Sequence, residues 1–273
     1  MGPEEPLWDV AVPASPGRLP GAAMAGFSDR GRTPAGLRLI PPPAVTLALV
    51  FGPGTVVLSG AAGRGSVVAG LGFGTTRVTQ AADFACVQVR LPPMIAGAVL
   101  GVRPAELDGG FIALDDLWGR DAARLAERLS ETPSWEERFA LTDAVLARRL
   151  DAGPAADPEV AWAWGRMVRT RGRVRVERLA DDVGWSRKRL WSRFRAQIGL
   201  PPKRAARLVR FDHAVHRLVA GQDAAFVAAD AGYADQSHLH REVRAFTGIT
   251  PAVVAGEPFL TIDGLAWPSP ARG

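Results

Sequence analysis

The spacing of apolar residues changes along the chain, from short strand-like runs in the first third to helical spacing afterwards. Between about residues 37 and 91, short apolar runs are separated by Gly and Pro, including a turn-forming Gly52-Pro53-Gly54. Strands of this length at hairpin spacing predict a small antiparallel sheet or barrel. The runs most typical of strands are residues 45–51, 55–58, 67–69 and 87–91.

Helical signals replace this pattern after Pro92. Ser134 and Glu137 have the spacing of a capping box, in which two side chains satisfy backbone N–H groups of the first helical turn. Asp157 followed by Pro158 is typical of another helix start, because proline fits the first turn. Apolar residues then recur at intervals of three and four. The expected helices cover residues 94–100, 115–129, 134–150 and 158–172.

Composition sets the outer limits of these parts. Residues 1–36 are rich in Pro, Gly and Ala with little periodicity, which predicts an irregular segment. A boundary is expected at residues 151–154, Asp-Ala-Gly-Pro, or just after. We therefore predict an α+β chain with an irregular segment at 1–36, strands followed by helices at 37–152, an all-helical domain at 157–256 and a tail at 257–273.

Two similar helix pairs lie in the helical part. In the first pair, the apolar residues of 176–183 fall on one helical face, and Gly184 can adopt the positive φ of a tight turn. Ser186 can cap the next helix. A short helix, a glycine turn and a capped second helix are typical of the helix-turn-helix motif. The second helix has an apolar stripe at Leu190, Phe194 and Ile198.

The second pair repeats the arrangement. Residues 225–233 correspond to its first helix and turn, and Asp235 can cap a helix over 236–246. Residues 202–219 read as one long helix between the pairs. Two such units can present two recognition helices to successive major grooves, about 34 Å apart on one face of B-DNA. The buried stripe of the last helix is expected at Leu239, Val243 and Phe246.

Charge is concentrated in the same region. Residues 166–256 carry 18 Lys and Arg against 8 Asp and Glu, whereas the rest of the chain carries 15 and 20. A basic C-terminal third on an acidic body favours a polyanion as partner, although a basic patch can also be a solvated surface.

Other candidate chemistry is weak. Cys86 is the only cysteine, so no intramolecular disulfide or cysteine-based zinc site is available, and a buried small hydrophobe is favoured over a reactive thiol. Gly70-x-Gly72-x-Gly74 lacks the strand–helix context of a nucleotide-binding loop and predicts a turn-rich loop. His213 and His216 could meet on a helix, but a metal site there is disfavoured. We expect no cofactor, no metal and no enzymatic activity.

The chain is expected to be cytoplasmic and without a membrane contact. Its longest apolar stretch, residues 44–51, is far shorter than a bilayer span. The acidic start MGPEEPLWDV differs from the basic start of a signal peptide.

Residues from about 174 to 254 resemble the DNA-binding domain of AraC/XylS-type regulators. Residues 232–251 follow the signature G-[FY]-x-[DS]-Q-S-[HY]-[FL]-x-R-x-F-[KR]-x-x-x-G-x-[TS]-P closely, and the first pair also fits, at Leu179-Ala180 and from Ser186 to Pro202. Two positions depart from the family pattern. Val243 stands where the family usually has Phe, and Trp191 stands where a smaller or polar residue is usual.

The resemblance implies two groups of DNA contacts. Contacts with base edges determine sequence choice, whereas contacts with phosphates contribute affinity and salt dependence. The residues implied at base edges are Lys188, Trp191 and Ser192 on the first recognition helix, and Gln236, Ser237, His240 and Arg241 on the second. The residues implied at phosphates are Arg187, Arg193, Arg195, Lys203, Arg204 and Arg244.

The resemblance also implies that the protein is a sequence-specific transcription regulator. Its partners would be double-stranded promoter or operator DNA and RNA polymerase. The N-terminal domain, often a cupin-like barrel followed by helices in this family, would bind a small-molecule effector or form a homodimer. Two alternatives come from other classes: a DNA alkyl-transfer protein that uses Cys86, and a sequence-neutral nucleoid-type binder.

Overall fold

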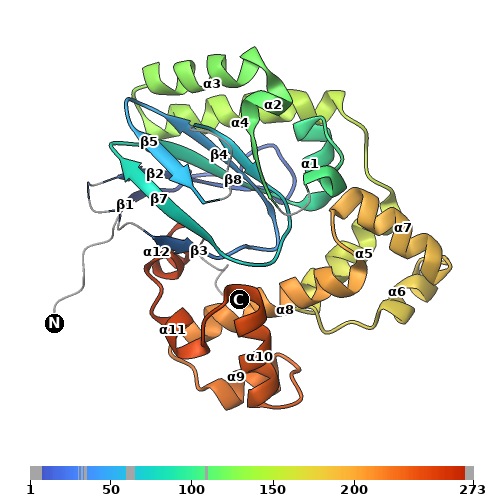
Figure 1. Ribbon diagram of the computed structural model, residues 1–273. Helices are drawn as coiled ribbons and strands as arrows, with labels where there is room; N and C mark the ends of the chain where they lie inside the picture. The colour runs from blue at the N-terminus through green and yellow to red at the C-terminus, as the bar shows by residue number, and fades with distance from the viewer. Residues whose placement is uncertain are drawn as a thin grey trace.

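The computed structural model describes residues 8–29, 31, 33, 36–59, 65–107 and 110–267. A β-rich N-terminal part precedes a part made only of helices, which confirms the α+β class. Helices α3 (Arg120–Glu131) and α4 (Trp135–Ala152) lie across one side of the sheets, as Figure 1 shows. The C-terminal helices, in yellow to red, lie on other sides.

The larger sheet is antiparallel and has the strand order β1-β2-β8-β4-β6-β9. Along β4, Val45, Leu47 and Leu49 are buried, while the alternate residues are half-buried. Because side chains alternate across a strand, β4 presents two different faces. The strands are β1 (Trp8–Ala11), β2 (Ala23–Asp29), β8 (Ala85–Leu91), β4 (Val45–Phe51), β6 (Val67–Ala69) and β9 (Phe111–Ala113).

The smaller sheet has the order β3-β7-β5, with β3 (Leu37–Leu39), β7 (Thr76–Ala82) and β5 (Thr55–Leu58). The hairpin expected around Gly52-Pro53-Gly54 is wrong, because β4 pairs with β6 and β8 whereas β5 pairs with β7. Gly54 lies against β7, where a Cβ atom would come within 2.0 Å of the carbonyl oxygen of Ala82. Among the described strands the two sheets stay separate, so the sheet expected from the sequence is present without closure into a barrel.

Short helices follow the strands: α1 (Pro93–Leu100), a 3-10 turn η1 (Pro104–Leu107) and α2 (Leu114–Trp118). The capping box at Ser134 and Glu137 is confirmed at the start of α4. The single helix expected over 115–129 is wrong, because Gly119 breaks it into α2 and α3. Its φ of +55° with ψ of −133° is a conformation that interrupts a helix and favours glycine.

The irregular segment expected at 1–36 is also corrected. It supplies β1 and β2, and Trp8 packs edge-on against Phe27 and Phe84 at centroid distances of 5.7 and 5.8 Å. Four successive residues of β2, Met24 to Phe27, are buried. A strand buried on both faces has no alternating pattern, which explains why periodicity missed it. Residues 1–7, 30, 32, 34 and 35 of this segment lie outside the described residues.

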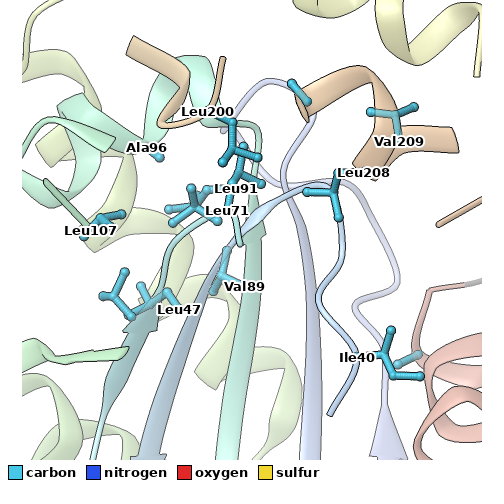
Figure 2. Packing of buried hydrophobic residues seen from close by; sticks show 14 of the residues in the cluster. Ile40, Leu47, Leu71, Val89, Leu91, Ala96, Leu107, Leu200, Leu208 and Val209 are labelled. Atoms are coloured by element: carbon cyan, nitrogen blue, oxygen red, sulfur yellow. The ribbon is translucent and has the colours of Figure 1, made fainter. Parts of the chain in front are cut away.

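The helical C-terminal part follows the sequence expectation closely. Leu200 and Leu208 belong to the same buried cluster as Leu71 and Leu91, so one hydrophobic core joins the two parts (Figure 2). No helix among the described residues is long and apolar enough to cross a membrane. The helices are α5 (Pro158–Arg169), α6 (Val176–Asp182), α7 (Arg187–Ile198), α8 (Pro202–Val219), α9 (Ala224–Asp230), α10 (Gln236–Thr247) and α11 (Pro251–Ala255).

The tail expected at 257–273 is instead largely a helix, α12 (Pro258–Ala266), which packs against β1, β3 and α8. Its apolar residues Phe259, Leu260 and Ile262 are buried, so hydrophobic contact with the sheets holds it in place. Glu257, just before the helix, pairs with Arg38 of β3. Residues 268–273 lie outside the described part.

A cluster of charges ties α12 to both parts of the chain. Asp263 of α12 accepts a hydrogen bond from Arg90 of β8, and its Oδ2 lies 2.9 Å from Nε2 of His216 on α8. Burial disfavours the imidazolium form, but Asp263 and the nearby Asp212 outweigh it and raise the pKa of His216 to about 9. Arg90 also lies over the ring of Trp267, 4.4 Å from its centroid.

These charges predict that stability falls as the pH rises from about 6.5 through about 9. A histidine whose folded-state pKa lies above its unfolded value contributes stability that is complete below the unfolded pKa and lost above the folded one. Desolvation also raises the pKa of the partly buried Asp212, which has the same sign. We expect the free energy of unfolding to fall by about 1–2 kcal/mol over this pH range, after allowance for solvent screening of the partly exposed imidazole.

Urea unfolding of the full chain between pH 6 and 10 measures this dependence. His216→Gln should flatten the curve in that range, while His240→Gln, at an exposed position, should leave it as in the unmodified protein. An unchanged slope in His216→Gln would show that His216 does not contribute to the pH dependence.

Candidate nucleic-acid interface

The first helix pair consists of α6 and α7 and the turn between them. Gly184 has a φ of +66°, and the N–H of Trp185 donates to the carbonyl oxygen of Ala180 at 2.9 Å, which closes the turn. The Ser186 hydroxyl accepts from the N–H of Arg189 at 3.2 Å and so caps α7. Both features are the ones that the sequence predicts, and together they fix the direction in which α7 leaves the turn.

The second pair, α9 and α10, repeats this geometry. Gly232 has a φ of +76°, and Asp235 accepts from the N–H of His238 at 2.6 Å at the start of α10. Gly248 ends the helix in a left-handed conformation. The two units are therefore alike in local structure, and α8 connects them, as Figure 1 shows.

Each second helix has one apolar face turned into the protein. Leu190, Phe194 and Ile198 of α7 are fully buried. On α10, Leu239, Val243 and Phe246 are buried as well, so Val243 keeps the buried position despite its smaller volume. The opposite faces of both helices carry polar and basic side chains and remain open to solvent.

All thirteen residues that the family resemblance implies at DNA are exposed. Trp191 is the unusual one, since 47% of this large apolar residue is accessible. The guanidinium of Arg195, one helical turn later, lies 5.5 Å from the centroid of its ring. An exposed tryptophan beside an arginine is suited to a partner that offers apolar and anionic groups together.

Three of the arginines implied at phosphates already have partners within the chain. Arg193 forms two hydrogen bonds of 2.7 Å with the Asp157 carboxylate, which lower the pKa of that carboxyl. Arg204 lies over the ring of Phe73 at 4.2 Å, and Arg195 lies over Trp191. Among the described residues, Arg187, Lys188, Lys203, Arg241 and Arg244 form no ion pair.

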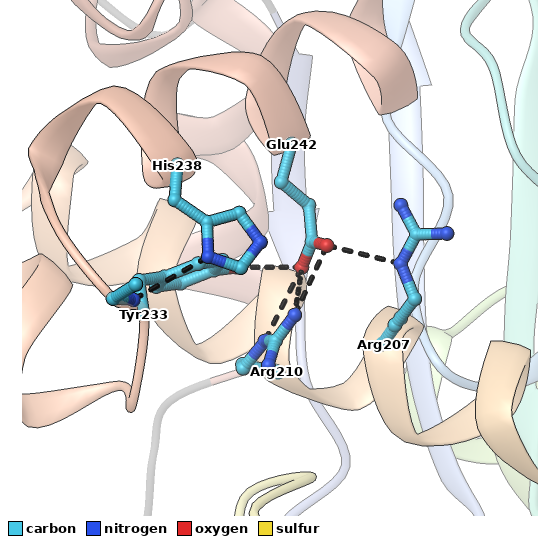
Figure 3. Close-up of polar contacts among 6 residues, drawn as sticks. Arg207, Arg210, Tyr233, His238 and Glu242 are labelled. Carbon is cyan, nitrogen blue, oxygen red and sulfur yellow. Dashed lines mark hydrogen bonds and ion pairs between the residues drawn. The ribbon is translucent and has the colours of Figure 1, made fainter.

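Glu242 is an important residue that sequence reasoning missed. It is buried on α10, and its carboxylate accepts hydrogen bonds from Arg210, Arg207 and the Tyr233 hydroxyl (Figure 3). The shortest contact with Arg210 is 2.8 Å and that with Tyr233 is 3.0 Å. Burial, followed by the charge of Glu242, raises the pKa of Tyr233, so the phenol stays protonated and donates. We call these contacts the Glu242 network, and its two arginines connect α10 with α8.

The position of Glu242 in the sequence contained a usable signal. It lies three residues after Leu239 and four before Phe246, which places it on the buried face of α10. A carboxylate on such a face needs positively charged or donor partners. The two arginines of α8 are the groups that meet this need.

The remaining candidates form no reactive site in the described part of the chain. His238 packs edge-on against Tyr233 at 5.2 Å, and its Nδ1 accepts from the N–H of Ala234 at 3.4 Å. No described group of His, Cys, Asp and Glu could hold a metal ion. Cys86 is buried, and burial raises its pKa to about 12, which disfavours the thiolate that nucleophilic chemistry needs.

A comparison with known protein families supports the two helix-turn-helix units. A family model described as a helix-turn-helix domain matches residues 179–256. No curated protein sequence matches the chain.

Similar solved structures include an AraC-type transcriptional regulator from Chromobacterium violaceum, at 20% identity and a TM-score of 0.35, covering 37% of this chain and 92% of that one. ToxT from Vibrio cholerae O395 is similar over 88% of this chain and 97% of its own, at 7% identity and a TM-score of 0.49. The C-terminal domain of AraT from Geobacillus stearothermophilus shares 16% identity, covering 37% of this chain and 85% of that one, with a TM-score of 0.35. The family match and the two paired helix units lead to one conclusion: residues 179–256 form a helix-turn-helix domain.

Proposed function

We propose that this chain is a sequence-specific DNA-binding transcription regulator without enzymatic activity, which places α7 and α10 in successive major grooves of promoter DNA. The observation that carries the proposal is the pair of capped, exposed second helices, each anchored by a buried apolar stripe and joined by α8. RNA polymerase at the same promoters is the further partner that this function requires.

The side chains on the exposed faces suit base edges. Arg and Lys donate to O6 and N7 of guanine, Gln bonds adenine in two places, and an apolar ring packs on a thymine methyl. His240 lies within 3.5 Å of Gln236, so these two side chains act as one polar patch. The proposed base contacts are Lys188, Trp191, Ser192, Gln236, Ser237, His240 and Arg241.

Phosphate contacts are proposed for Arg187, Arg193, Arg195, Lys203, Arg204 and Arg244. For Arg193, DNA binding exchanges the Asp157 carboxylate for a phosphate, so its net contribution is smaller than that of Arg187 or Arg244. Each phosphate contact releases counterions and makes the affinity fall as salt rises.

Replacing Arg241 tests base recognition. After selection of a preferred site from random DNA, Arg241→Ala should weaken binding to that site by about 1–3 kcal/mol and relax the preference at one base pair. Arg244→Ala should weaken selected and random DNA equally. Titrations by fluorescence anisotropy on both DNAs separate these effects.

Arg120→Ala, an exposed arginine on α3, is the matched control and should leave both affinities unchanged. Equal losses on both DNAs for Arg241→Ala would instead make Arg241 a phosphate contact. Uniform footprints of the unmodified protein over promoter and random DNA would refute sequence-specific regulation and favour a nucleoid-type binder.

We further infer that the N-terminal part regulates DNA binding by taking up a small molecule, with homodimerisation as the second route of control. Support for a ligand comes from the inter-sheet cavity, a space of about 220 Å³ whose walls include β4, β6 and β8 of the larger sheet and β3, β5 and β7 of the smaller one. Concave and mostly apolar spaces are where proteins usually bind small molecules, so this cavity is the candidate ligand site.

A further inference from the structure

The walls of the inter-sheet cavity are formed by one face of each sheet. Thr46, Ala48 and Val50, the alternate residues of β4, point into it, while their neighbours pack into the core. Ala48 and Ala69 are small residues on this wall, and the glycine-rich loop at residues 70–74 also lines the cavity. The sequence therefore keeps the space open with small side chains.

In the described part of the chain, the lining of the cavity is mostly apolar and carries no charged side chain. Among the described residues, no Asp, Glu, Lys, Arg or His lines it. Its polar side chains are Thr46, Thr75, Thr76 and the amide of Gln88, together with the protonated thiol of Cys86. The aromatic residues of the lining are Trp8, Phe27, Phe73, Phe84, Phe111 and Phe259.

Two of these aromatic rings belong to contacts with the helical part. Phe73 packs against Phe246 of α10 at a centroid distance of 4.6 Å, and Phe246 stacks on Phe211 of α8 at 4.5 Å. Arg204 of α8 covers the same Phe73 ring. A molecule that moves Phe73 therefore acts directly on the packing of the second recognition helix.

The second ring, Phe259, is on α12. One helical turn later Asp263 holds His216 of α8 and Arg90 of β8. Helix α12 starts after the segment that the helix-turn-helix family model matches, which ends at residue 256. This chain thus has a second connection between the cavity and α8, outside the family domain.

We propose that the inter-sheet cavity binds a small, neutral, apolar molecule carrying at most one hydroxyl or carbonyl group, and that Phe73 and Phe259 couple its binding to the affinity for DNA. Only the coupling to DNA rests on the function proposed above, whereas the assignment of the ligand class does not. Among the described lining residues, a carboxylate or ammonium group would find no charged partner, and a sugar would leave most hydroxyls unpaired. An apolar cavity of about 150 Å³ holds one benzene ring, so this one accepts a substituted or fused aromatic compound or a monocyclic terpene.

Calorimetric titration of the full chain with matched probe pairs tests the ligand class. The neutral probes are 4-isopropyltoluene and naphthalene, and their charged partners are 4-isopropylbenzoate and 1-naphthoate. At least one neutral probe should bind, and its carboxylate should bind at least roughly 100-fold more weakly. Absence of binding by both neutral probes up to their solubility, or equal binding of a carboxylate, would overturn the assignment.

Cavity-filling variants locate the bound probe. Ala48→Phe should reduce the affinity for the neutral probe by at least roughly tenfold, because its ring occupies the space. Ala69→Phe is the second variant in case the first does not fold, and circular dichroism checks both. Ala123→Phe, at an exposed position of α3, is the matched control and should bind the probe normally. Normal binding by folded Ala48→Phe and Ala69→Phe would refute this site.

The coupling is measured by titrating the selected DNA site with and without the bound probe. The probe should change the DNA affinity at least roughly fivefold in the unmodified chain, and less in Phe73→Leu and Phe259→Leu. An unchanged DNA affinity would overturn the coupling but leave the ligand class intact. Probe binding by a protein that shows no DNA preference would refute the proposed function and not the cavity assignment.

Discussion

Glu242→Ala is expected to lower the free energy of unfolding by about 3–5 kcal/mol. The substitution removes the acceptor of three side chains and leaves Arg210, whose side chain is only 17% exposed, without its counter-charge. It also leaves the buried Tyr233 hydroxyl without an acceptor. Removing one partner of a buried charge pair is strongly destabilising because the other charge stays buried. Arg207 contributes less, since water reaches 42% of its side chain.

Urea unfolding at pH 7, followed by far-UV circular dichroism, gives the magnitude for Glu242→Ala. Glu242→Gln keeps an oxygen that accepts from Tyr233 but removes the charge, so its loss should be smaller. Glu177→Ala replaces an exposed glutamate of α6 and should change stability by less than about 0.5 kcal/mol. A loss below about 1 kcal/mol for Glu242→Ala would show that the Glu242 network does not hold α10 on α8.

The loss of the network has a consequence for DNA binding. Glu242 follows Arg241 directly, so the backbone that positions a proposed base contact is held by the neighbouring buried carboxylate. Glu242→Ala should therefore weaken binding to the selected DNA site even under conditions where the protein remains folded.

Phe246→Ala is expected to destabilise the chain by about 3–5 kcal/mol. The Phe246 ring is 1% exposed and lies between Phe211 and Phe73, so its removal leaves a cavity where α10, α8 and the loop at residue 73 meet. The two surrounding rings cannot close this space fully, because Phe211 is held on α8 and Phe73 on a loop of the N-terminal part. Thermal and urea unfolding measure the loss.

Phe226→Ala is the matched control for this substitution. Phe226 is 60% exposed on α9, and its ring interacts mainly with the guanidinium of Arg217 at 5.2 Å. Its replacement should cost less than about 1 kcal/mol. Similar losses for the two variants would contradict the central position of Phe246 in the packing of α10.

The two helix-turn-helix units were predictable from the sequence because their determinants are local. Ser186 and Asp235 cap helices that begin at the next residue, and Gly184 and Gly232 supply positive φ at the turns. The apolar stripes repeat at helical intervals, so they indicate which face of each helix is buried. The residues proposed to contact DNA come from the family resemblance, and all but Lys203 and Arg204 of α8 lie on these same exposed faces.

The sheets were less predictable because strand pairing is not local. The runs at 45–51 and 55–58 correspond to real strands, but the sequence could not show that β4 and β5 join different sheets. Strand β2 was not predicted because it is buried on both faces, so its apolar and polar residues do not alternate. The sequence predicted a tail where α12 lies, because the apolar residues of α12 are buried only by contact with strands that are distant in the sequence.

The class of fold, the two helix-turn-helix units and the exposed faces proposed to read DNA follow from local sequence patterns, because caps, turns and periodicity act within a few residues. Four features depend on long-range packing: the pairing of the strands, the inter-sheet cavity, the Glu242 network and the packing of α12 against β1, β3 and α8. Each of these joins residues from distant parts of the chain, such as Arg90 with Asp263 or Phe73 with Phe246. Such contacts follow from packing and charge pairing in three dimensions, which no local pattern encodes.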